Sequence, residues 1–164
     1  LNGTDFTPRL LREIGRPLTL YLLGGQKGVA EMAAAKLAEI APQHRIGGLR
    51  HGYFTPDERP GIVAAIAAAK PDILLVAMGN PAQERFIADN FEALGCGVAV
   101  GVGALFDFLS GRVNRAPAWM QRVRLEWLYR LWLEPGRLWR RYHLGNSQFL
   151  WRLMRTPKPG AASR

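Results

Sequence analysis

The chain has 164 residues, 48% of them hydrophobic, which suits one folded domain with its own core and excludes a disordered chain. The formal net charge of +9 is unevenly placed, because residues 112–164 carry 12 Lys and Arg against 2 Asp and Glu, whereas residues 1–111 carry 10 against 11. The single cysteine excludes an internal disulfide, and no apolar run approaches the roughly 20 residues of a membrane-spanning helix.

The first third of the chain predicts half of a βαβ unit. We expect a helix over residues 9–14, a strand over 18–23 and an alanine-rich helix over 29–40. The glycines between this strand and helix predict a tight turn, and Gly25 is a candidate lining residue of a site. The turn has neither the dinucleotide-binding glycine pattern nor the P-loop lysine pattern.

The next segment predicts a short strand over 45–49, a loop with the sequence HGYF over 51–54, and a helix over 56–69. Tyr53 in this loop has two comparable interpretations, a ring that stacks on a base or an aromatic residue of the core. His51 has no partner at metal-ligand spacing, which favours a solvated loop histidine.

The stretch DILLVAMGNPAQE, residues 72–84, predicts the centre of the fold. Its apolar run over 73–77 suits a parallel strand buried on both faces, and a helix follows over 82–94. Asn80 and Gln83 would then stand at the carboxyl end of a buried strand, beside a helix N-terminus. Ligands of open α/β sheets bind there, and anions are favoured. The alternative is a tight turn capped by Asn80.

A last strand is expected over 97–102, completing a strand–helix alternation that predicts an α/β fold with a Rossmann-like open parallel sheet flanked by helices. Gly103 follows this strand and would allow close backbone approach. Asp107 lies just beyond the strand end, where it could cap a helix or supply a carboxylate to a ligand.

The pattern changes after residue 111, which we expect to end the sheet domain. Residues 112–155 predict a basic, aromatic helical appendage that contains all five tryptophans, and residues 156–164 predict a frayed terminus. Its charge favours an anionic partner, which could be a nucleic acid, a phosphorylated ligand or a membrane surface.

Several motifs in this order resemble the bacterial WecG/TagA/CpsF family of glycosyltransferases over nearly the whole chain: GGQKG, HGYF, DILLVAMGNPAQE, GVGALFDFLSG, RAPAW, LEWLYRL and EPGRLWRRY. The resemblance implies inverting transfer of a hexose or N-acetylhexosamine-type sugar from a UDP-sugar to a polyprenyl-diphosphate-linked sugar. It also implies a peripheral enzyme at the cytoplasmic face of the bacterial plasma membrane, acting in cell-surface polysaccharide or teichoic acid synthesis.

The same resemblance implies roles for individual residues. Tyr53 would lie against the uracil, Asp107 would bind the uridine, and Gln83 would support catalysis near the transferred sugar. Three arginines of the appendage would close over the diphosphate: Arg130, Arg137 and Arg140. The implied partners are the donor, the acceptor and an anionic membrane surface, with no cofactor and no nucleic acid, and self-association is left open.

The charge of the leaving group supports metal-independent transfer. The UDP diphosphate gains charge as the glycosidic bond breaks, and this charge must be stabilised by a metal or by cationic side chains. The sequence has no Asp-x-Asp pair and no His/Asp cluster at metal-ligand spacing. Arginines remain, and their planar guanidinium groups suit phosphate oxygens.

One departure from the family pattern concerns the general base. The family carries further motifs upstream of the position that matches residue 1, including the acidic residue thought to deprotonate the acceptor hydroxyl. We therefore expect the chain to begin inside a longer protein and to lack that base.

Two other classes of function compete with a glycosyltransferase. A nucleic-acid-binding module would use the basic aromatic appendage, although aromatics at helical spacing with leucines more often indicate packing. A dinucleotide-dependent oxidoreductase is disfavoured, because the G-x-G-x-x-G motif and the ribose-binding acid are missing.

Overall fold

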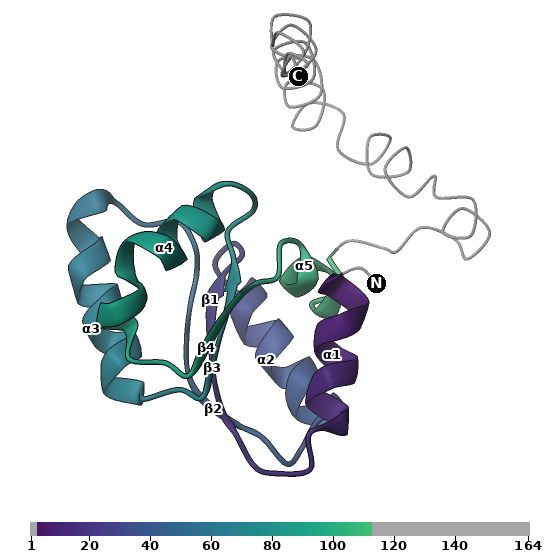
Figure 1. The fold of residues 1–164 in the computed structure, drawn as a ribbon. Coiled ribbons are helices and arrows are strands. Elements are labelled where there is room, and N and C mark those ends of the chain that lie inside the picture. Colours follow the sequence, from purple (N-terminus) through teal and green to yellow (C-terminus); the bar gives the residue numbers. More distant parts are fainter. Residues whose placement is uncertain (1–2, 113–164) are drawn as a thin grey trace, which may run out of the picture. The chain divides into compact units, whose positions relative to one another are not determined.

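The computed structural model describes residues 3–112, which form a four-stranded, entirely parallel sheet with helices on both faces (Figure 1). The strands are β1 (Thr19–Gly24), β2 (Arg45–Arg50), β3 (Ile73–Ala77) and β4 (Val98–Gly101), in the spatial order β2-β1-β3-β4. The predicted Rossmann-like α/β sheet is therefore confirmed. Apart from Arg112, the predicted appendage over 112–155 and the terminus over 156–164 lie outside the described residues.

Two helical layers enclose the sheet. One layer contains α1 (Gly3–Glu13), α2 (Val29–Ile40) and α5 (Leu105–Leu109), and the other contains α3 (Arg59–Ala69) and α4 (Ala82–Leu94) (Figure 1). Successive strand residues point to opposite faces, so Leu20 and Leu22 join the first core cluster whereas Tyr21 and Leu23 join the second. No helix among residues 3–112 has the length and apolar character needed to cross a bilayer.

Strand β3 lies at the centre of this arrangement. It pairs with β1 on one side and β4 on the other, and all five of its residues are buried. Burial on both faces explains why its sequence is an unbroken apolar run rather than an alternating one. The predicted bounds of this strand and of the helix after it, α4, match the structure.

Three local predictions need correction. Helix α1 begins at Gly3 rather than near residue 9, and Pro8, which suggested a start, lies inside the helix. The helix expected over 56–69 starts as a 3-10 turn, η1 (Pro56–Glu58), before α3. The segment after β4 contains the five-residue helix α5, which is too short to produce a periodic sequence signal.

Candidate functional site

The candidate site is the carboxyl edge of the sheet between β1 and β3. From β1 the chain crosses through α2 to β2 on one side, and then through α3 to β3 on the other side of β1. The connections that leave β1 and β3 consequently run to opposite faces of the sheet. Such a topological switch point opens a crevice at the carboxyl ends of the strands, and this is where ligands of open α/β sheets bind.

Backbone hydrogen bonds join the loops that surround this switch point. The Gly25 N–H donates to the Ala77 carbonyl oxygen at 2.9 Å, which links the loop after β1 to the end of β3. The Gly52 N–H donates to the Gly25 carbonyl oxygen, also at 2.9 Å, which adds the HGYF loop after β2. The predicted tight turn at Gly25 therefore lies at the contact between three loops.

Gln83 connects the loops after β3 and β4. Its side chain is 5% exposed, and its Oε1 accepts hydrogen bonds from the Gly79 N–H at 3.2 Å and the Gly103 N–H at 3.1 Å. Its Nε2 donates to Glu84 Oε1 at 2.9 Å. The amide oxygen thus accepts one N–H from each loop, so the local role of Gln83 is to hold the loops after β3 and β4 together beside the site. Its role near a transferred sugar stays a prediction.

Gly103 has a backbone conformation that favours glycine. A Cβ built at this position would meet no atom within 4 Å, but its φ is +55°, in the left-handed region. The glycine permits the turn that directs its N–H towards Gln83, and its close approach to a ligand stays a prediction.

Tyr53 projects from the HGYF loop. Its side chain is 65% exposed, which excludes the interpretation as a core aromatic and leaves the ring available to a ligand. Asn80 is also exposed, and the N-cap of α4 falls on Pro81 rather than on Asn80, so the predicted Asn80 cap is wrong. His51 is half-buried rather than fully solvated, with its Nδ1 shielded from solvent and without a hydrogen-bond partner among the described residues.

Asp107 lies inside α5 and does not cap it. The N-cap of that helix is Ala104, so the cap interpretation is wrong and the role as a ligand carboxylate stays a prediction. Its side chain is half-buried in the first turn, where a carboxylate complements the helix dipole.

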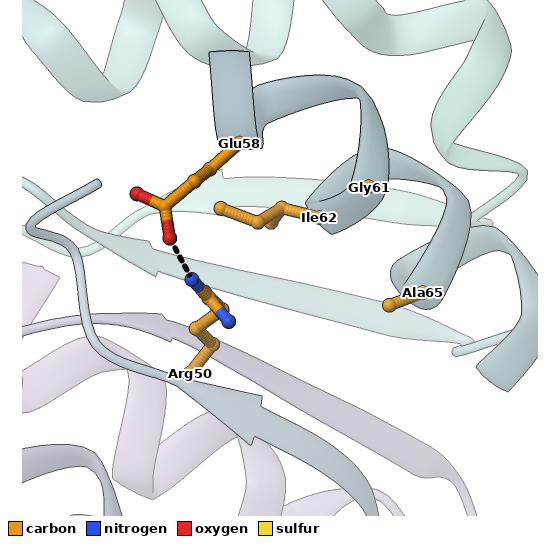
Figure 2. Close-up of a pocket in the computed structure, with 5 residues that line it drawn as sticks. All are labelled: Arg50, Glu58, Gly61, Ile62 and Ala65. Carbon is orange, nitrogen blue, oxygen red and sulfur yellow. Dashed lines mark hydrogen bonds and ion pairs between the residues drawn. The ribbon is translucent and has the colours of Figure 1, made fainter. Parts of the chain in front are cut away.

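An ion pair closes the outer end of the HGYF loop. Arg50, the last residue of β2, donates from a terminal guanidinium nitrogen to Glu58 Oε1 at 2.8 Å, and the two side chains border an open cleft of about 250 Å³ (Figure 2). Ile62 and Ala65 of α3 also line this cleft. The cleft is at the outer strand β2, so it is separate from the β1/β3 switch point.

The second oxygen of Glu58 contacts Thr55. Oε2 accepts the Thr55 N–H at 2.8 Å and the Thr55 hydroxyl at 3.3 Å. Chiefly through the Thr55 N–H bond, the surroundings hold the pKa of Glu58 below its ordinary value. Our sequence analysis missed this residue, although Thr55-Pro-Asp-Glu58 fits the Ser/Thr-x-x-Glu capping-box signal.

Among residues 3–112 no three His, Cys, Asp or Glu side chains gather as a metal site would require. The three arginines expected to contact the diphosphate, Arg130, Arg137 and Arg140, lie outside the described residues.

A parallel α/β sheet with a β1/β3 switch point defines the class of Rossmann-like open α/β folds. Within that class, the family model described as "Glycosyl transferase WecG/TagA/CpsF family" matches residues 1–162. The chain belongs to this family, which confirms the resemblance found in its motifs.

The chain is also similar to a curated protein of known name. The chain is 40% identical over 122 residues to N-acetylglucosaminyldiphosphoundecaprenol N-acetyl-beta-D-mannosaminyltransferase from Bacillus subtilis (strain 168). The match covers 74% of this chain but only 46% of that relative, so the chain corresponds to less than half of the relative's length.

Proposed function

We propose that this chain forms the nucleotide-sugar-binding part of an inverting glycosyltransferase. The donor would be a UDP-sugar with a hexose or N-acetylhexosamine-type sugar, and the acceptor a polyprenyl-diphosphate-linked sugar. The observation that carries the proposal is the β1/β3 switch point with its joined loops, in a chain of a glycosyltransferase family. The name of the Bacillus subtilis relative supports the acceptor class, because it specifies a diphosphoundecaprenol-linked sugar.

Each part of the donor has a proposed contact. The exposed Tyr53 ring would stack on the uracil, and Asp107 would accept a hydrogen bond from the uridine. Gln83 would keep the loops after β3 and β4 in place beside the transferred sugar, since its Oε1 holds an N–H from each loop. Gly25 and Asn80 would line the rim between these contacts.

The bond changes define the remaining requirements. The acceptor hydroxyl oxygen attacks the anomeric carbon, the bond from that carbon to the UDP oxygen breaks, and a base takes the hydroxyl proton. Arg130, Arg137 and Arg140 would stabilise the charge on the leaving diphosphate, so the proposed transfer uses neither a metal nor another cofactor. The base would correspond to a residue in the part of the Bacillus subtilis relative that the match does not cover.

UDP binding without a divalent metal tests this proposal. Calorimetry on the 164-residue protein should give the same UDP affinity in excess EDTA and in added Mg²⁺ or Mn²⁺, because arginines supply the positive charge. Binding that requires the metal would overturn metal independence. NAD in the same titration tests the oxidoreductase alternative, for which NAD and not UDP would bind.

Turnover should depend on a longer chain. We expect the 164-residue protein to bind UDP-sugar but to transfer sugar about 10²- to 10⁴-fold more slowly than a version extended to the relative's length, the usual contribution of a general base. Equal rates would place the base within residues 1–164.

The basic segment over 112–155 is proposed to bring the enzyme to the cytoplasmic membrane face, where its polyprenyl-linked acceptor resides. Tryptophan and arginine suit the headgroup region of an anionic bilayer. Co-sedimentation with liposomes should increase with anionic lipid and decrease with salt. Salt-dependent binding to DNA with no preference for anionic liposomes would favour the nucleic-acid alternative instead.

A further inference from the structure

We propose that Glu58 is a positioning residue that fixes Tyr53 against the planar base of the donor without touching the donor itself. This inference rests on the proposed function, because Tyr53 is assigned there to the uracil. It adds a residue that lies outside the loop and connects the loop's two ends.

The carboxylate of Glu58 links the two ends of the HGYF loop through hydrogen bonds. One oxygen accepts from the Arg50 guanidinium, directly before residues 51–54, and the other accepts from the Thr55 N–H and hydroxyl, directly after them. Figure 2 shows Arg50 at the end of β2 and Glu58 in η1, directly before α3, pointing toward each other. A single side chain therefore sets the distance between the loop's ends.

The residues on either side of Tyr53 are fixed by other contacts. The Gly52 N–H donates to the Gly25 carbonyl oxygen at 2.9 Å, and a Cβ at Gly52 would lie only 3.0 Å from the Gly24 Cα, so the two loops are closely packed at this point. On the other side the Phe54 ring packs edge-on against Phe86, with 6.0 Å between the ring centroids.

These constraints distinguish Tyr53 from an ordinary exposed aromatic residue. Its neighbours are anchored to the backbone of the β1 loop and to the core, while its own ring is 65% exposed. Because the backbone on both sides of Tyr53 is anchored, the loop loses little conformational freedom when a planar ligand stacks on the ring. The entropic cost of ordering the loop therefore reduces the binding free energy only slightly. Removal of the Glu58 carboxylate would leave the outer end of the loop more flexible, so that ligand binding would have to order it and would become weaker.

Binding of UDP and of inorganic diphosphate to the full 164-residue protein tests the inference, because diphosphate lacks the base. Tyr53→Ala should weaken UDP binding about 5- to 150-fold, the range of a lost base–aromatic stack. Glu58→Ala should weaken UDP binding about three- to tenfold, which is less than the loss in Tyr53→Ala. The diphosphate affinity of Glu58→Ala should stay within about twofold of that of the control variant Asp57→Ala. That control removes the same charge one residue earlier in the same 3-10 turn.

A double mutant separates positioning from a general structural effect. If Glu58 acts through Tyr53, Glu58→Ala in the Tyr53→Ala background should cause no further loss of UDP affinity. Circular dichroism and thermal unfolding confirm that each variant is folded. Because Glu58 is nearly half-exposed, with 46% side-chain exposure, Glu58→Gln provides a milder second variant with the same expected ligand selectivity.

The outcomes distinguish this inference from the function on which it rests. No UDP binding by the wild type would overturn the proposed function. UDP binding that Tyr53→Ala weakens but Glu58→Ala changes no more than Asp57→Ala does would overturn the positioning role alone. Equal losses for UDP and diphosphate in Glu58→Ala, or additive losses in the double mutant, would also overturn it.

Discussion

At both ends of the sheet, side chains accept hydrogen bonds from backbone N–H groups, but the surroundings of these side chains differ. At the amino end, buried His44 accepts the Leu18 N–H on Nδ1 at 3.2 Å and contacts the Leu11 carbonyl oxygen through Nε2 at 2.7 Å. Asp72 accepts the Thr19 N–H at 2.7 Å, which ties the start of β3 to the start of β1. At the carboxyl end, Gln83 likewise accepts backbone N–H groups from two loops.

The difference is in what these contacts leave exposed. His44 at the amino end is buried and holds α1, β1 and the start of β2 together. At the carboxyl end the contacts hold loops from which Tyr53 and Asn80 are exposed to solvent. We infer that substitutions at the amino end should change stability alone, whereas those at the carboxyl end should also change ligand affinity.

The largest expected stability effect is at the amino end. His44→Ala should lower the free energy of unfolding by about 2–3 kcal/mol, because the buried Leu18 N–H loses its acceptor and a void remains. Gln43→Ala is the graded control, expected to cost about 0.5–1.5 kcal/mol, since Gln43 makes a separate 3.0 Å bond to the Leu11 carbonyl. Urea unfolding measures both.

The same two variants test the independence of the two ends. Calorimetry below the unfolding transition should give UDP affinities within about twofold of the wild type for both, because neither residue touches the carboxyl-end loops. A loss of UDP affinity in His44→Ala that matches its loss of stability would contradict the division between the two ends.

At the carboxyl end, substitution of Gln83 by glutamate tests the contacts of this side chain. Gln83→Glu keeps an acceptor for the Gly79 and Gly103 N–H groups but places a second carboxylate against Glu84, whose Oε1 now accepts from the Gln83 amide. We expect this variant to lose about 1–2 kcal/mol of stability together with UDP affinity, and Gln83→Glu/Glu84→Gln to recover most of both.

Two other results would revise this account. Recovery of stability without UDP affinity in the double variant would show that Gln83 or Glu84 contacts the ligand directly. Glu84→Gln alone is the matched control, because it removes the same charge while Gln83 keeps its amide. A wild-type stability in Gln83→Glu would show that the second carboxylate does not repel Glu84, which would contradict the expected cost of losing the Gln83–Glu84 contact.

Local sequence signals predicted the sheet well. The buried strand β3 and the helices α2 and α4 have the predicted bounds, because an apolar run and an apolar helical period are encoded by neighbouring residues. The predicted start of α1 was wrong because Pro8 suggested a helix start, whereas in the structure Pro8 is the sixth residue of the helix.

The contacts that hold the site could not be predicted in the same way. The Gln83–Gly103 bond joins residues 20 positions apart, and the His44–Leu11 contact joins residues 33 positions apart. Such pairs depend on strand order, which the sequence did not specify. The exception is Thr55–Glu58, whose three-residue spacing is a local capping signal, although its link to Arg50 is not.

The smallest expected effect is the pH dependence of the Glu58 contacts. The pKa of this carboxyl lies below its ordinary value of 4.5, first because the Thr55 N–H bonds to the carboxylate and further because the Thr55 hydroxyl and Arg50 favour the charge. A group whose pKa is lowered by folding contributes stability above its unfolded pKa, and that contribution is lost as the pH falls through the folded pKa. Wild type should therefore be more stable than Glu58→Gln at neutral pH, and the difference should shrink as the pH falls below 4.5.

Urea unfolding of the two proteins from pH 7 to pH 3 measures this difference, and the other groups near Glu58 are present in both. Arg50, Arg59 and Asp57 are the same in both proteins, so their contributions to the difference largely cancel. Asp57→Asn serves as the control for a lost charge in the same turn. A difference between wild type and Glu58→Gln that persists unchanged at pH 3 would show that the side chain's shape, not its charge, closes the HGYF loop. Because the same carboxylate is proposed to position Tyr53, the advantage of wild type in UDP affinity should decline over the same pH range in which its stability advantage declines.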